Sequence, residues 1–201
     1  AKSEGNTMMT QNLAVLAVIV IMATTLLMLV GQKWRNSIIV LAVQYLAVFW
    51  LVSLVWPIGL AAVKLVVGWM VCALIGSSLP ERESEEDFQG IFGNIFHIAT
   101  AGAVWLVVFS ISPTLVKWIP TGLVILWGGM ILIGVGILQI GVANHNLRVI
   151  FGLVTVISGF EIIYAAVENS VLVTGLLAIT NLGLALVGAY LTAEVLEEES
   201  P

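Results

Sequence analysis

Glu161 and Lys64 are the two residues of this sequence whose presence is hardest to explain by helix packing alone. Each is an ionisable side chain inside a long apolar run, Glu161 in VIFGLVTVISGFEIIYAAV and Lys64 in IGLAAVKLVVGWMVCALIG. Holding a charge in such a run is costly, and ionisable residues inside membrane segments commonly mark ion pathways or proton relays. We therefore predict a proton-relay site at this pair. The alternative interpretation is structural, with Lys64 extending its ammonium to the interface and Glu161 serving as a packing partner.

The composition predicts a membrane environment for both charges. The chain has 201 residues, of which 60% are hydrophobic and 9% are charged, whereas about 25% of the residues of a soluble domain are charged. The net charge of −5 comes largely from two acidic patches, at 81–87 and 194–199, which lie outside the apolar runs. We expect these patches to be exposed to water, and they do not indicate a nucleic-acid partner. The lipid bilayer is the expected surroundings.

The apolar runs predict an all-α, polytopic transmembrane helical bundle of about seven spans. Roughly 20 residues at about 1.5 Å each cross a hydrocarbon core of about 30 Å, and no run alternates at the strand period. The predicted spans are Asn12–Val30, Ser37–Trp56, a third that follows the Pro57 turn and ends near Leu79, Ile91–Ile111, Thr121–Ala143, Leu147–Val167 and Val171–Thr192.

Basic residues in the connecting segments indicate the orientation, because Lys and Arg favour the cytoplasmic side. The loops after spans one, three and five hold four basic residues, and the opposite side holds two; they are Lys33, Arg35, Arg82 and Arg148 against Lys2 and Lys117. This count predicts an outside N-terminus and a cytoplasmic C-terminus. Lys64 and Glu161 then both lie roughly 9–10 Å below the outer boundary, so the opposite charges could meet directly or through water.

Other polar residues inside or beside the spans are candidate supporting groups for the relay. They are Gln44, Gln139, Tyr164, Glu168 and Asn181. The competing explanation for each is an ordinary hydrogen bond between helices, although a water-filled path would use the same residue types. Trp34, Trp56 and Trp118 lie at predicted span boundaries, where tryptophan anchors membrane helices.

No motif indicates an enzyme active in its own right. The single cysteine, Cys72, excludes an intrachain disulfide and a cysteine metal cluster, and His97 and His145 are far apart in sequence. Neither a phosphate loop, a nucleophile elbow nor a dinucleotide-binding motif followed by a strand is present. We therefore expect no catalytic, cofactor-binding or metal-binding residues.

The last three spans resemble the small K-type subunit of complex I, the proton-pumping NADH:quinone oxidoreductase. The features that carry the resemblance are a polar hinge ending in Asn146-Leu147, a Gly-x-Glu-Ile segment within 158–163 and a Gly-Leu-Ala-Leu segment within 182–186. The whole seven-span plan is more similar to the E-type membrane subunit of hydrogenase-4-like and formate-hydrogenlyase-like complexes. Its lysine-bearing third helix resembles the sequence around Lys64, and its hinge resembles 146–152.

The resemblance divides the chain into an N-terminal four-helix membrane region, 1–120, with an acidic cytoplasmic loop at 80–90, and a three-helix K-like region, 121–201, with an acidic tail. Two departures are clear. The E-type acid would fall nearer Ile157, one turn before Glu161 on the same helix face. The K-type pattern has a second glutamate in its last helix, whereas 177–181 contains no acid. Lys64 then replaces that glutamate as a partner, or the relay is reduced.

The resemblance implies a non-catalytic subunit of a proton-translocating complex I-like or group 4 hydrogenase-like oxidoreductase. Its partners would be other membrane subunits, especially antiporter-like ones, in a bacterial or archaeal inner (cytoplasmic) membrane. Two rival functions remain: a purely structural or assembly subunit of another membrane complex, and a small stand-alone transporter. A stand-alone transporter would be expected to contain inverted repeats with broken helices. The sequence shows neither feature apart from the Pro57 turn.

Overall fold

The computed structural model describes residues 2–31, 33–78, 91–119, 121–168 and 170–198, and no β-strand occurs within these ranges. Each of its helices contains an apolar stretch of 19 to 23 residues, long enough to cross a membrane. The chain is therefore an all-α polytopic integral membrane protein. The predicted acidic loop at 80–90 lies outside the described residues. The helices are α1 (Lys2–Val30), α2 (Trp34–Ser53), α3 (Ile58–Ser77), α4 (Ile91–Leu115), α5 (Leu123–Gly141), α6 (Asn146–Val167) and α7 (Val171–Glu198).

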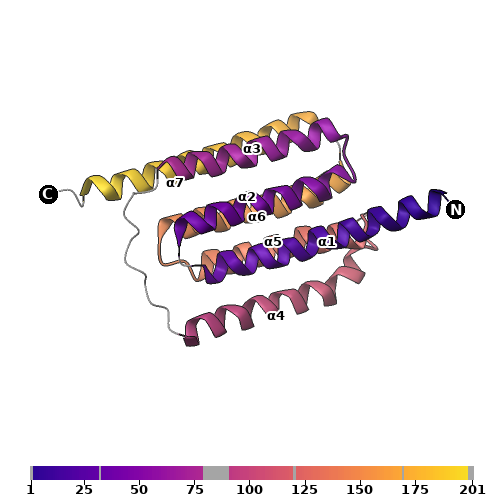
Figure 1. Ribbon diagram of the computed structural model, residues 1–201, viewed down its shortest axis with the longest axis horizontal. Helices are drawn as coiled ribbons and strands as arrows, with labels where there is room; N and C mark the ends of the chain where they lie inside the picture. The colour runs from indigo at the N-terminus through magenta and orange to yellow at the C-terminus, as the bar shows by residue number, and fades with distance from the viewer. Residues whose placement is uncertain (1, 32, 79–90, 120, 169, 199–201) are drawn as a thin grey trace.

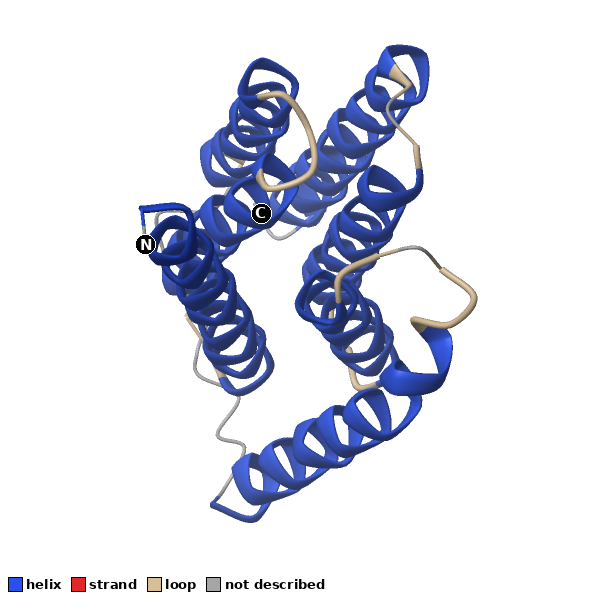
Figure 2. Ribbon diagram, turned by 90° about the vertical axis from the view of Figure 1, so that its right-hand side faces the viewer, coloured by secondary structure: helices blue, strands red, loops and turns tan. Residues whose placement is uncertain are grey.

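Six of the helices form two rows of three that face each other (Figures 1 and 2). In one row α2 packs between α1 and α3, and in the other α6 packs between α5 and α7. Across the rows, α1 contacts α5, α2 contacts α6 and α3 contacts α7. Helix α4 lies at the edge, against α5 and α1. The start of α1 and the end of α7 lie at opposite ends of the bundle (Figure 1), as an odd number of crossings requires.

Several helix ends differ from the predicted spans. Helix α2 ends at Ser53 rather than Trp56, and α4 continues from the predicted end at Ile111 through Pro113 to Leu115. Proline lacks a backbone N–H, so Pro113 cannot donate to the carbonyl four residues earlier. Hydrogen bonding continues past the proline, because the backbone N–H of Val116, directly after Leu115, donates to the Ser112 carbonyl at 3.0 Å.

The first and last helices of the chain, α1 and α7, are longer than their apolar spans. Helix α1 begins at Lys2, although its apolar part begins at Thr10 rather than at the predicted Asn12. Helix α7 continues beyond the predicted end at Thr192 to Glu198. Most of the acidic segment 194–199 is therefore a helical extension of the last span.

Trp56 differs from the predicted membrane anchor. It lies in the tight turn between α2 and α3, but only 3% of it is exposed, and its indole N–H donates to the Glu168 carbonyl oxygen at 3.2 Å. Trp118, in contrast, is 82% exposed, as an interfacial anchor should be. Trp56 thus fastens the α2–α3 turn to the end of α6.

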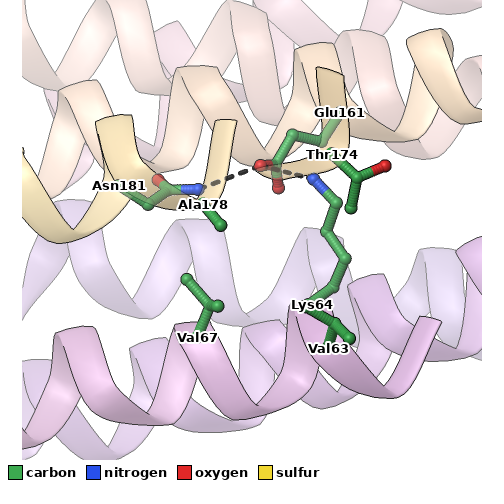
Figure 3. Close-up of a pocket in the computed structure, with 7 residues that line it drawn as sticks. All are labelled: Val63, Lys64, Val67, Glu161, Thr174, Ala178 and Asn181. Atoms are coloured by element: carbon green, nitrogen blue, oxygen red, sulfur yellow. Dashed lines mark hydrogen bonds and ion pairs between the residues drawn. The ribbon is translucent and has the colours of Figure 1, made fainter. Parts of the chain in front are cut away.

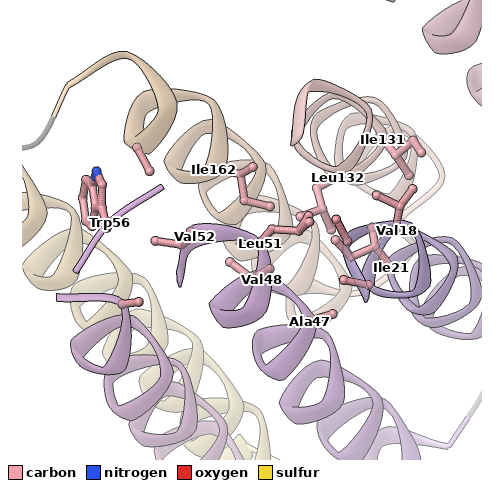
Figure 4. Close-up of a cluster of buried hydrophobic side chains, with 14 of the residues drawn as sticks. Val18, Ile21, Ala47, Val48, Leu51, Val52, Trp56, Ile131, Leu132 and Ile162 are labelled. Atoms are coloured by element: carbon pink, nitrogen blue, oxygen red, sulfur yellow. The ribbon is translucent and has the colours of Figure 1, made fainter. Parts of the chain in front are cut away.

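Two buried apolar clusters fill the space between the rows. The first joins α1, α2, α5 and α6 through side chains such as Ile21, Leu51 and Leu132 (Figure 4). The second joins α2, α3, α6 and α7 around Tyr45 and Phe151. Inside a membrane no hydrophobic driving force brings helices together, so their association depends on close packing. These clusters therefore determine how the helices are aligned with one another.

Glycines bring the backbones of α5 and α6 into direct contact, the most extensive helix contact in the structure. A Cβ atom at Gly159 would lie 2.5 Å from the Gly129 carbonyl oxygen, and one at Gly152 would lie 3.0 Å from the Gly136 carbonyl oxygen. Residues with side chains would hold the helices apart. This glycine seam (Gly129, Gly136, Gly152 and Gly159) therefore fixes the position of α6, the helix that carries Glu161.

Candidate functional site

Glu161 and Lys64 form an ion pair in the interior of the protein. The Lys64 Nζ lies 2.5 Å from Glu161 Oε1, and the two side chains are only 6% and 1% exposed. Lys64 is six residues after the start of α3 (58 to 64), and Glu161 is six residues before the end of α6 (161 to 167). Because α3 and α6 cross in opposite directions, equal counts place the two charges at equal depth.

Asn181 brings the third helix, α7, to the pair. Its side-chain amide Nδ2 donates a hydrogen bond to Glu161 Oε1 at 3.0 Å. The same carboxylate oxygen thus receives both the lysine ammonium and the asparagine amide (Figure 3). Asn181 is 1% exposed. The buried triad (Lys64, Glu161 and Asn181) consequently joins α3, α6 and α7 through polar contacts.

A small cavity adjoins the triad, with about 10 Å³ of room for the centre of a water molecule. Figure 3 shows the Glu161 carboxylate, the Lys64 ammonium and the Asn181 amide converging beside it. Its apolar wall comes from α3 and α7. The lining residues are Val63, Lys64, Val67, Glu161, Thr174, Ala178 and Asn181. On this measure the space suits about one water molecule rather than a larger ligand.

Two aromatic side chains lie close to the part of α3 that carries the lysine. The ring of Tyr45 occupies the place that a side chain at Gly68 would need, one turn from Lys64. A larger residue at this position of α3 would push Tyr45 away from the site. On the other side, the Trp56 ring centroid lies 6.0 Å from Lys64 Nζ, which is at the outer limit of a favourable cation–π contact.

Polar residues continue from the triad along α6 toward its N-terminal end. Thr155, Ser158 and Glu161 recur at three-residue steps and are each 1% exposed. Tyr45 lies near Ser158 and Glu161, and Gln44 Nε2 donates to Thr155 Oγ1 at 3.4 Å. This polar file (Gln44, Tyr45, Thr155 and Ser158) extends between α2 and α6. Phe151, also 1% exposed, follows it one turn beyond Thr155.

The structure brings together three of the residues singled out from the sequence and separates the others. Lys64, Glu161 and Asn181 make the triad, and Gln44 belongs to the polar file. Tyr164 stacks on Phe160 with ring centroids 6.1 Å apart. Gln139 is buried on α5, which contributes no lining to the cavity. Glu168 is exposed at the end of α6 and contributes its backbone carbonyl to Trp56.

Sequence reasoning missed Tyr45 and Thr174. Tyr45 follows Gln44, and its hydroxyl is among the buried polar atoms without a hydrogen bond in the described part of the chain. Thr174 precedes Ala178 by four residues and Asn181 by seven, so one face of α7 carries all three. That spacing was a usable signal. Nothing in the sequence, however, indicates that this face meets α3 rather than lipid.

The residue types of the triad suit proton transfer. Among the described residues, no group of three or more His, Cys, Asp and Glu side chains could hold a metal ion. A buried carboxylate beside an ammonium and an amide can instead accept and release a proton, because the neighbours favour its ionised form and the apolar surroundings favour its neutral form.

Comparisons of this chain with protein-family models, with curated proteins and with solved structures each gave no match. Its function is therefore inferred from the site.

Proposed function

We propose that this integral membrane protein is a non-catalytic subunit of a proton-translocating assembly and that Glu161 passes protons with the help of Lys64. The observation that carries the proposal is the buried contact between Glu161 and Lys64, two side chains from different helices that are 1% and 6% exposed. Breaking such a pair leaves a charge without compensation. A proton that moves onto or off Glu161 therefore changes the energy of the whole three-helix contact.

The contacts of Glu161 suit a group that changes protonation. Lys64 and Asn181 both stabilise the carboxylate form by donating to Oε1, whereas burial stabilises the neutral acid. When opposing effects nearly balance, a small displacement of Lys64 is enough to shift the proton. An assembly that drives transport can use such a displacement.

The polar file supplies a route toward Glu161 from the side of the α6 N-terminus. Ser158 and Thr155 carry hydroxyl groups, and the Tyr45 hydroxyl and Gln44 Oε1 make no hydrogen bond among the described residues. Hydroxyl and amide groups both donate and accept hydrogen bonds. We propose that intervening water joins these groups into a hydrogen-bonded route for the proton.

The resemblance to the complex I K-type and hydrogenase-4 E-type subunits names the assembly that we propose. A complex I-like or group 4 hydrogenase-like complex in a bacterial or archaeal inner membrane would place antiporter-like subunits beside this chain. Helices α4 and α7 have the smallest buried share of all the spans. Their broad apolar surfaces are available for partner helices or lipid. The outside N-terminus, the cytoplasmic C-terminus and the division at residue 120 remain predictions of the same proposal.

Glu161→Gln is expected to abolish proton translocation while leaving the complex assembled. Glutamine keeps the volume and can accept from Lys64 and Asn181, but it cannot carry a proton. The measurement is dye-monitored acidification of membrane vesicles that contain the native complex, with subunit content checked by mass spectrometry. Glu168→Gln, at an exposed glutamate directly after the end of the same helix, is the matched control and should pump normally.

The outcome also separates the proposal from the structural rival. Normal pumping by Glu161→Gln together with impaired assembly would favour a purely structural or assembly subunit. Gentle detergent purification tests the partner assignment directly. Antiporter-like subunits with iron–sulfur or [NiFe] proteins should co-purify, and a small homogeneous oligomer without redox partners would contradict the assignment.

A further inference from the structure

Three buried polar atoms at the cavity wall have hydrogen-bonding capacity that no described protein group uses. They are Glu161 Oε2, Asn181 Oδ1 and, apart from the ion pair with Glu161 Oε1, Lys64 Nζ. Leaving a buried polar atom without a partner costs about 1–3 kcal/mol, so native proteins seldom do so. Three such atoms around one cavity indicate an occupant that satisfies them together.

The chemistry of the three atoms specifies the occupant. Glu161 Oε2 accepts hydrogen bonds, and Lys64 Nζ donates them. Asn181 must present its oxygen as a second acceptor, because its nitrogen faces the carboxylate oxygen Oε1. Water can donate two hydrogen bonds and accept one from the ammonium. Three is the typical number for a buried water, which requires roughly 10–15 Å³ of room for its centre, and the cavity offers about 10 Å³.

We propose that this cavity binds a single water molecule, held by Lys64, Glu161 and Asn181, and that it excludes alkali cations. The binding of water follows from the cavity and its three polar atoms. The role of that water, which is to exchange the proton directly with Glu161 Oε2, rests on the proposed function. The proton, rather than Na⁺, is then the ion that the site handles.

Charge accounts for the exclusion of cations. The ammonium of Lys64 already neutralises the carboxylate of Glu161, with 2.5 Å between the two atoms. A sodium ion in the cavity would lie beside this ammonium and would bring a positive charge without compensation into apolar surroundings, which is strongly unfavourable. Neutral water adds no charge.

The first test is a crystal structure of the full chain in a lipid phase at a resolution that shows ordered water, with a second data set after exchange into rubidium chloride. We expect one density peak within hydrogen-bond distance of all three atoms and no anomalous rubidium signal. Sodium and lithium should leave the thermal unfolding temperature unchanged relative to choline. A featureless cavity overturns the inference, and so does a cation-dependent rise in unfolding temperature that Glu161→Gln removes.

Filling the cavity tests the role of the water. Ala178→Val adds two methyl groups at the cavity wall and is expected to remove the density peak and to lower proton translocation at least tenfold. Val67→Ile fills the same space from α3, in case the first variant does not fold. The matched control is Gly175→Ala on α7, where an added Cβ meets nothing within 4 Å. It should retain both the peak and the translocation.

The results separate this inference from the proposed function. If wild-type protein holds the water but Glu161→Gln pumps normally, the water site stands and the relay fails. If Glu161→Gln stops pumping and the cavity holds no water, the relay stands and this inference fails. Normal pumping by a well-folded Ala178→Val variant that has lost the peak would overturn the role of the water alone.

Discussion

Lys64→Met is expected to destabilise the folded bundle by about 3–5 kcal/mol, because it leaves the buried Glu161 carboxylate without its counter-charge. Methionine matches the length of the lysine stem but cannot donate to Glu161 Oε1. The measurement is thermal or denaturant-induced unfolding of the purified full chain in a fixed detergent, followed by circular dichroism.

The double variant Lys64→Met/Glu161→Gln should recover much of that loss, since both charges are then absent and Asn181 can still donate to residue 161. This recovery measures the coupling between the two side chains. Lys117→Met, at an exposed lysine between α4 and α5, is the matched control and should unfold like the wild type. If Lys64→Met were as stable as this control, the ion pair would make no contribution to the fold.

Gly159→Val is expected to have a comparable or larger effect, by separating α5 from α6. A Cβ atom at this position would lie 2.5 Å from the Gly129 carbonyl oxygen and 2.8 Å from the Ile133 amide nitrogen. Because these atoms belong to the backbone, no side-chain rotation relieves the overlap. Overpacking costs about 1–3 kcal/mol even where side chains can adjust, so we expect a loss of at least that size. The measurements are the unfolding of the detergent-solubilised chain and the amount of protein that is recovered as a single species.

Gly183→Val is the control for this substitution, since it places the same side chain in another membrane helix at an exposed position where an added Cβ meets nothing within 4 Å. It accounts for the intrinsic cost of valine in a helix. Equal stability of Gly159→Val and Gly183→Val would show that the two backbones can separate without penalty. Gly159→Ala should lie between the wild type and the valine variant.

The equal level of the two charges could be predicted because it depends only on counting along single helices. Hydropathy gives the spans, and a fixed rise per residue converts position into depth. Lys64 and Glu161 were therefore placed at one level before any helix was placed beside another. Their contact confirms that level, since a direct ion pair requires it.

The neighbours of the pair could not be predicted, because they depend on which helices adjoin. Asn181 was recognised as a polar residue inside a span, but α7 had first to be placed against α3 and α6. Thr174 and Tyr45 were missed for the same reason. Trp56 was assigned to the membrane interface from its place in the chain, yet the turn folds it onto the Glu168 carbonyl and buries it.

The glycine seam indicates which helices can move relative to Glu161. Glu161 is carried by α6, whose backbone lies directly against that of α5 along the glycine seam, so we expect these two helices to move together. Lys64 and Asn181 are carried by α3 and α7, which contact each other at the far side of α2 and α6 (Figure 1). Force applied by a partner to the α3–α7 pair would withdraw the lysine from the carboxylate. A force applied to α5 would carry Glu161 along with α6, so separation of the ion pair depends only on how far α6 and α3 move relative to each other.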